Sequence, residues 1–177
     1  MRTQFFWRSA IVAVAAIAML TVQTRTASAQ EDKYKAMFVL NFTKQIDWPA
    51  TKGDFVICVV NQDEVFEALN SMAKKGMMVD DKAISVAGVK NIDEAPECQI
   101  LYLPASESKA DKMGSAVEKF GNAATLIVSD SQGALENGSC INFVEIDEKI
   151  KYEASKANIE NRGLMANQAL LNNAVNN

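Results

Sequence analysis

Three short and almost continuously apolar segments constrain the fold of this chain more than any other feature. They are rich in β-branched residues and are followed by polar positions: DFVICVV at 54–60, CQILYL at 98–103 and ATLIVSD at 124–130. Strands without alternation of apolar and polar residues are typically covered on both faces, as in parallel sheets flanked by helices. The sequence therefore predicts an α/β fold built on buried strands.

Helical segments alternate with these strands. Asp63 is suited to cap a helix, EVFEALNSMAKK, that ends at Gly76, and a second helix is predicted from Ser106 to Phe120, with Gly121 as its stop. Another strand, AISVAGV, lies between them. This order predicts a three-layer α/β sandwich with a mainly parallel sheet and helices on both faces.

The pattern changes near the C-terminus. CINFVEI and KIKYEA alternate apolar and polar residues on either side of the turn DEK, which predicts a C-terminal antiparallel β-hairpin. Two short helices, in SKANIENRG and NQALLNNAV, are expected to finish the chain.

The first 29 residues have the pattern of a secretory signal. Arg2 and Arg8 precede the apolar core SAIVAVAAIAML, and Ala27-Ser28-Ala29 supplies the small residues that signal peptidase requires. The apolar run is about 12 to 14 residues, shorter than the roughly 20 that span a bilayer. We expect cleavage after Ala29, a periplasmic protein that is not inserted in the membrane, and a single domain at 30–177.

Composition excludes several classes of function. The chain has no histidine, so imidazole-based nucleophilic and zinc sites are absent. Without residues 1–29 it keeps 15 of its 18 Lys and Arg residues and all 22 Asp and Glu residues, which argues against nucleic acid as a partner. Adjacent acids such as Asp80-Asp81 are typical of turns, and the methionines are typical of core filling. We predict no catalytic residues, no metal site, no cofactor and therefore no enzyme.

Several ordered segments resemble a known family. These are a helix ending in Asn41-Phe42 and followed by Trp48-Pro49, strands carrying Cys58 and Cys98, then TLIVSD, INFV and the closing KIKYEAS and GLMANQALL. Their order over residues 30–177 is similar to that of the YfiR-like family of bacterial periplasmic proteins. The resemblance implies a regulator that represses an inner-membrane diguanylate cyclase, which makes cyclic-di-GMP, or that acts on a sensor kinase.

The resemblance also bears on the cysteines. It implies a disulfide between Cys58 and Cys98; the alternative is that both are small buried residues. In this chain Ser139-Cys140 stands where the family pattern has glycine or another small residue, and Cys140 has no remaining partner. We expect Cys140 to be a free thiol, either buried or available for an intermolecular bond.

The helix predicted at 32–47 is apolar on two sides. One side carries Tyr34, Phe38, Phe42 and Ile46, with Val39 beside them; the other carries Ala36, Met37 and Leu40. One interpretation buries both sides and lets Asn41 hydrogen-bond a neighbouring backbone. The other makes Met37, Leu40 and Lys44 a surface that binds a partner.

The sequence leaves three candidate functions to compare. The first is a regulatory protein that binds an inner-membrane signalling protein, with a homodimer as a possible assembly. The second is a small-molecule binding module, whose ligand would lie near Val60-Asn61 and Ser129-Asp130 at the carboxyl ends of parallel strands. The third, an enzyme that uses acids alone, needs two carboxylates facing one cleft, and the sequence indicates no such pair.

Overall fold

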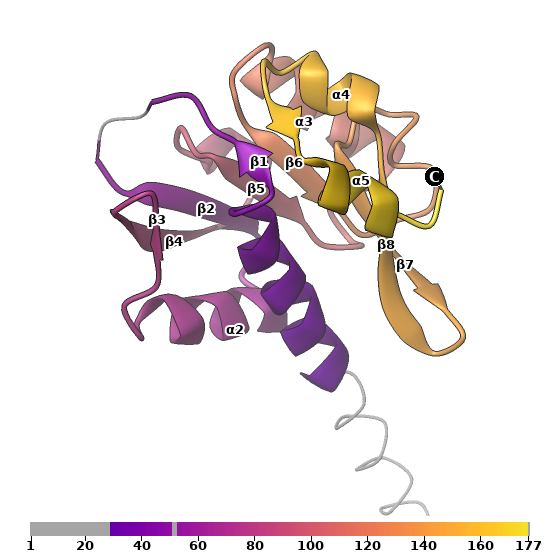
Figure 1. Cartoon of the computed structure of the whole chain (residues 1–177). Coiled ribbons are helices and arrows are strands. Elements are labelled where there is room, and N and C mark those ends of the chain that lie inside the picture. The colour runs from indigo at the N-terminus through magenta and orange to yellow at the C-terminus, as the bar shows by residue number, and fades with distance from the viewer. Residues whose placement is uncertain (1–28, 51–52, 177) are drawn as a thin grey trace, which may run out of the picture.

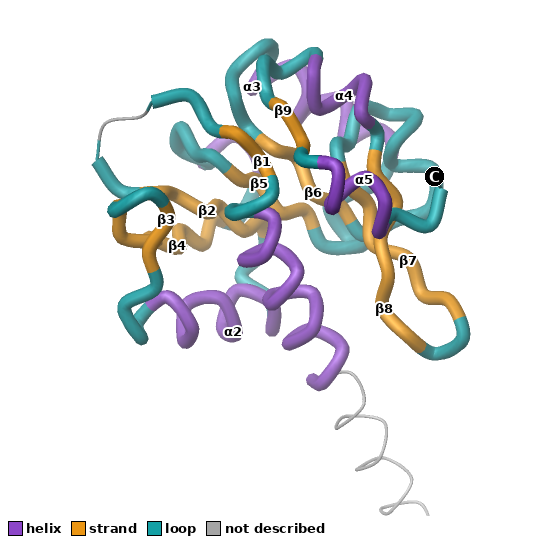
Figure 2. Tube along the Cα trace, in the orientation of Figure 1, coloured by secondary structure: helices purple, strands orange, loops and turns teal. Residues whose placement is uncertain are grey.

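The structure, a computed structural model, describes residues 29–50 and 53–176, so the predicted signal peptide lies outside it apart from Ala29. After an N-terminal helix at 29–42, the elements follow in this order: β1 Ile46–Asp47, β2 Phe55–Val60, α2 Glu64–Ala73, β3 Met78–Val79, β4 Lys82–Val89, η1 Ile92–Glu94, β5 Ile100–Leu103, α3 Ala110–Phe120, β6 Leu126–Ser129, β7 Ile141–Ile146, β8 Lys149–Ala154, α4 Lys156–Glu160, β9 Met165–Ala166 and α5 Gln168–Asn173 (Figures 1 and 2). None of the described helices is both long and apolar enough to cross a membrane.

Seven strands form one sheet in the order β3-β4-β2-β5-β6-β7-β8. The neighbours from β4 to β7 pair in parallel, whereas β3 and β8 pair antiparallel with β4 and β7. The sheet is therefore mixed, and the prediction of a mainly parallel sheet is corrected accordingly. The short β3–β4 hairpin was not predicted, while the β7–β8 hairpin was. Both hairpins turn at adjacent acidic residues with positive φ, Asp80-Asp81 and Asp147-Glu148.

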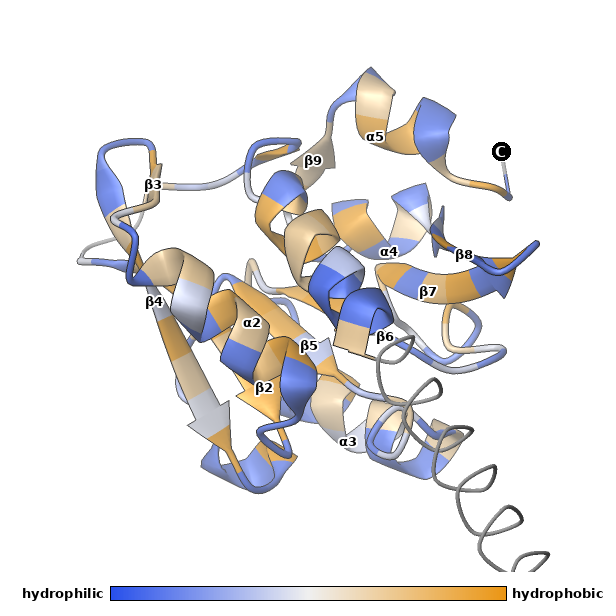
Figure 3. Cartoon of the chain, turned by 90° about the horizontal axis from the view of Figure 1, so that it is seen from below, coloured by the Kyte–Doolittle hydropathy of each residue, from blue (hydrophilic) through white to orange (hydrophobic). Residues whose placement is uncertain are grey.

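Apolar clusters cover both faces of the sheet. Phe55, Ile57 and Val59 of β2 point into one cluster, with the N-terminal helix and α2. Cys58 and Val60 point into the other, with α3. Figure 3 shows the apolar strands lying between helices. The buried strands expected from the sequence are confirmed because their side chains alternate between two dry interfaces.

The N-terminal helix ends earlier than the predicted Asp47. Thr43 Oγ1 donates to the Leu40 carbonyl, and Trp48 Nε1 donates to the Thr43 carbonyl, at 2.6 and 2.8 Å. These bonds satisfy carbonyls near the helix end. The chain then extends into β1, where Ile46 and Asp47 pair with β9 in a separate two-stranded sheet. The segment predicted as the last turn of the helix is therefore paired with β9 instead.

The start of α3 also differs from the prediction. The helix begins at Ala110, not at Ser106, and ends at Phe120 as predicted. Residues before it form a turn in which Ser108 Oγ donates to the Pro104 carbonyl at 2.9 Å. Asp63 caps α2 as predicted, because its side chain accepts a hydrogen bond from the Phe66 N–H at 3.2 Å.

Candidate functional site

The predicted partner-binding stripe on the N-terminal helix does not form. Leu40 is only 4% exposed and belongs to the core, whereas Met37 is 44% exposed and Lys44 is exposed. Tyr34, expected in the core, is 47% exposed. The buried face is centred on Ala36, Val39 and Leu40, which belong to the core cluster.

The residues that carried the family resemblance have different environments. Phe42 is fully buried, and Trp48 stacks edge-on against Phe55 with ring centroids 5.0 Å apart. Asn41 and Pro49 are exposed. The expectation of a buried, hydrogen-bonded Asn41 amide is therefore wrong, because the helix turns this position toward solvent beside Gln45.

The structure contains Cys58, Cys98 and Cys140 as buried free thiols. Cys58 and Cys98 lie in one apolar cluster. The neighbouring Cys98 side chain lowers the pKa of Cys58. The Cys58 side chain, together with burial, raises the pKa of Cys98. Burial likewise raises the pKa of Cys140. The Cys58–Cys98 disulfide stays a prediction, which is supported by the presence of both cysteines in one apolar cluster.

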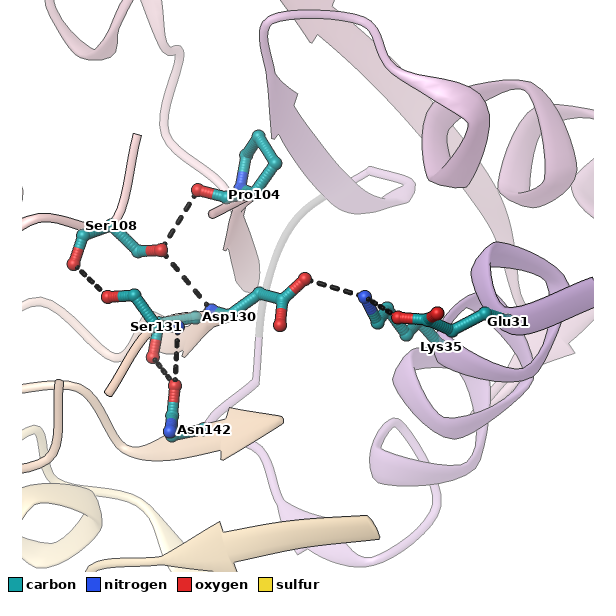
Figure 4. A network of polar contacts seen from close by, with 8 residues as sticks. Glu31, Lys35, Pro104, Ser108, Asp130, Ser131 and Asn142 are labelled. Atoms are coloured by element: carbon teal, nitrogen blue, oxygen red, sulfur yellow. Dashed lines mark hydrogen bonds and ion pairs between the residues drawn. The ribbon is translucent and has the colours of Figure 1, made fainter. Parts of the chain in front are cut away.

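A buried ion pair joins the N-terminal helix to the end of β6. Lys35 is 6% exposed, and its Nζ lies 2.7 Å from Asp130 Oδ2 and 2.7 Å from Glu31 Oε1. Figure 4 shows the Lys35 side chain pointing from the helix toward Asp130. Burial lowers the pKa of Lys35, but its hydrogen bonds to Asp130 and Glu31 outweigh this and raise it. Sequence reasoning missed Lys35, although its spacing to Val39 and Phe42 places it on the buried face.

Polar side chains fix the loop that carries Asp130. The Asp130 N–H donates to Ser108 Oγ at 3.3 Å, and Ser131 Oγ donates to the Ser108 carbonyl at 2.6 Å. Asn142 Oδ1 accepts from the Ser131 N–H at 3.1 Å (Figure 4). The Ser108 turn and β7 thus hold the loop from which the Asp130 carboxylate reaches Lys35.

Two other carboxyl groups near this edge of the sheet, those of Asp63 and Asp32, have raised pKa values. Burial raises the pKa of Asp63, despite hydrogen bonds from the Phe66 and Val65 N–H groups. Burial also raises the pKa of Asp32, although Lys35 partly offsets it. Their charges oppose ionisation of Tyr102, whose pKa burial already raises well above its ordinary value. Lys35 thus offsets part of the negative charge of the carboxylates at this edge of the sheet.

The proposed small-molecule crevice is only partly assembled. Asp130 lines a cavity of about 410 Å³ with Ser131, Asn142 and Glu153, but Val60 is buried and Asn61 does not line it. Lys35 of the N-terminal helix lies against Asp130 at this edge of the sheet. Among the described residues, no group of three or more His, Cys, Asp or Glu side chains is placed to hold a metal ion.

Removing the buried cation should destabilise the domain. Lys35→Met keeps most of the apolar stem but leaves Asp130 unpaired, and we expect a loss of about 2 to 3 kcal/mol. This loss is smaller than the roughly 3 to 5 kcal/mol that is typical when one partner of a fully buried ion pair is removed, because the Asp130 side chain remains 21% exposed. Because the pKa of Lys35 is raised in the folded state, the contribution of Lys35 to stability is fully present below pH 10.5, the ordinary pKa of this side chain. The contribution is lost as pH rises through the higher folded value.

Urea unfolding of parent and variant at several pH values tests this expectation. The difference in stability should be constant from pH 7 to pH 10 and should shrink above pH 10.5. Lys33→Met, which changes an exposed lysine on the same helix, is the matched control. Equal effects of the two substitutions would show that the ion pair contributes nothing specific.

A groove separates the N-terminal helix from the β7–β8 hairpin. The cavity has a volume of about 800 Å³. It is lined by residues of both elements and of the hairpin turn: Gln30, Glu31, Tyr34, Phe38, Glu145, Glu148, Lys149 and Ile150. In Figure 1 the N-terminal helix and the hairpin extend from the sheet in the same direction. The sequence located both elements but gave no sign that they would lie side by side.

Comparison with known proteins gives one match. A family model described as YfiR/HmsC-like matches residues 32–175, which include every described strand and helix except the first residues of the N-terminal helix. No curated protein has a sequence significantly similar to this chain. The matched range contains Lys35 and Asp130 and most of the groove.

Proposed function

Because the chain belongs to the YfiR/HmsC-like family, we propose that it is a periplasmic regulatory protein acting on an inner-membrane signalling protein. It binds the periplasmic part of a diguanylate cyclase or a sensor kinase and restrains or modulates its output. The observation that carries this proposal is the family match over almost the entire described chain.

Two features of the molecule support a binding role. Large apolar side chains remain exposed on the N-terminal helix and on the hairpin, at Tyr34, Met37 and Ile146. Tyr34 also lines the groove, and exposed apolar side chains are typical of surfaces that bind proteins. The sequence has no histidine, which leaves few residues suited to catalysis. A regulator that works by binding needs no such groups.

Affinity capture tests the proposal. Residues 30–177, immobilised at a single engineered site and incubated with detergent-solubilised membranes of the native cell, should retain a membrane protein with a cyclase or kinase domain. Mass spectrometry identifies the retained proteins, and bait unfolded by urea is the control. The proposal fails if no signalling protein is retained under conditions in which a known periplasmic interaction survives.

A further inference from the structure

The N-terminal helix and the β7–β8 hairpin diverge from a packed aromatic contact. At the closed end, the Phe38 ring lies 5.6 Å from Tyr152 and 6.0 Å from Phe143, measured between centroids. One helical turn earlier, Tyr34 is half-exposed and lines the groove together with Ile150. Ile150 pairs with Glu145 across the hairpin, and Phe143 pairs with Tyr152, so all four side chains share the face toward the helix. The apolar floor therefore continues from the core to the open end.

The rim of this groove is acidic. Glu31, Glu145 and Glu148 line it, with Lys149 as its one basic residue. The 410 Å³ cavity beside it shares Glu31, Glu145 and Ile150, and adds two more carboxylates. Among the described residues, Glu145 and Glu148 take part in none of the ion pairs. Lys35 is already paired with Asp130 and Glu31, so it does not neutralise the hairpin side.

We propose that the groove binds a basic amphipathic segment of a protein partner. One aromatic or aliphatic side chain of that segment enters between Tyr34 and Ile150, and flanking Lys or Arg side chains meet Glu145 and Glu148. Tyrosine beside an apolar pocket is a common anchor in interfaces, and complementary charge accelerates association and selects the partner. The inference deepens the proposed function, because this segment would belong to the periplasmic part of the signalling protein.

A second copy of this chain fits the groove poorly. The chain is acidic overall, with 22 Asp and Glu residues against 18 Lys and Arg residues. A two-fold symmetric contact through the groove would bring the same acidic rims together, and such like-charge contacts are unfavourable. The charge of the groove therefore selects a basic partner over self-association.

A peptide titration tests the chemistry of the groove. The probe is a 12-residue peptide of alternating lysine and leucine with one tryptophan, and its counterpart has glutamate in place of lysine. With the lysine peptide, amide signals of Tyr34, Glu145 and Ile150 in an ¹⁵N-labelled domain should shift together, and added salt should weaken binding. The glutamate peptide should shift none of them. Shifts that are absent, scattered over the surface or equal for the two peptides would overturn the proposal.

Charge reversal supplies the matched comparison. Glu145→Lys combined with Glu148→Lys should weaken binding of the lysine peptide about tenfold. Glu118→Lys combined with Glu136→Lys changes the net charge equally at exposed positions that do not line the groove, and should alter affinity less than about twofold. Melting curves confirm that all variants are folded. Equal weakening by the two pairs would mean that net charge alone, and not the groove, attracts the peptide.

The same variants separate this inference from the proposed function. If the parent and the Glu145→Lys/Glu148→Lys protein capture a signalling protein equally well, the groove assignment is wrong and the proposed function stands. If the parent captures no signalling protein but the lysine peptide still binds in the groove, the proposed function is wrong and the preference of the groove for basic segments stands.

Discussion

Phe42→Ala should lower the free energy of unfolding by about 3 to 5 kcal/mol, the largest effect that we expect from a single side chain. Phe42 is fully buried, and its ring centroid lies 5.1 Å from that of Tyr152 and 6.2 Å from those of Phe38 and Phe143. Removing it leaves a cavity between the N-terminal helix and the hairpin, and the surrounding rings can close that cavity only in part.

Urea unfolding followed by circular dichroism measures this loss. Tyr34→Ala is the matched control, since it removes an aromatic ring from the same helix two turns earlier. Because Tyr34 is 47% exposed, its loss should cost less than about 1 kcal/mol. Similar losses for Phe42→Ala and Tyr34→Ala would contradict the description of the helix as buried on its 36–39–40–42 side.

Oxidation of Cys58 and Cys98 to a disulfide should raise the stability of the domain by about 4 kcal/mol. The bond would close a loop of about 40 residues, and the chain-entropy model assigns that gain to the restricted unfolded state. The two thiols lie in a shared apolar cluster, and a periplasmic location would supply an oxidising environment. Stability of the regulator would then depend on the redox state of its compartment.

Peptide mapping under non-reducing conditions should find Cys58 linked to Cys98 in monomeric protein, and melting with and without reductant should give the stability difference. Cys140 is buried beneath the start of β7, so Cys140→Ala should leave both results unchanged. A bridge between Cys140 and either of the other cysteines would refute the pairing.

The strands were predictable because their chemistry is local. FVICVV is apolar at every position and LIVS at every position but the last, and the structure places them between two helical layers. The turns at Asp80-Asp81 and Asp147-Glu148 were also indicated by the sequence, since adjacent acids are typical of turns and Asp tolerates positive φ better than most residues. Each of these features depends on residues adjacent in sequence.

The features that were missed depend on distant partners. The pairing of Ile46 with Ala166 ends the N-terminal helix early, and neither segment alone indicates a strand. The periodicity of the N-terminal helix left open whether Leu40 is buried or faces a partner, and packing against the sheet buries it. Lys35 was not singled out because its partner, Asp130, comes from a segment that is distant in the sequence.

The groove was unpredictable for the same reason. Tyr34 and Ile150 belong to elements separated by most of the chain, and sequence periodicity does not fix the angle between them. The sequence did indicate a hairpin with an acidic turn, which the structure places opposite the half-exposed tyrosine.

The central claim, that this chain restrains a signalling protein from the periplasm, is tested most directly by signalling output in the native cell. The measurement compares cells that lack the gene with cells complemented by the full chain or by a chain without residues 2–29. Output is the cyclic-di-GMP concentration for a cyclase partner, or phosphorylation of the cognate regulator for a kinase. We predict that deletion changes output, that the full chain restores it, and that the chain without residues 2–29 does not. Unchanged output on deletion, or equal restoration by the two chains, would contradict the account.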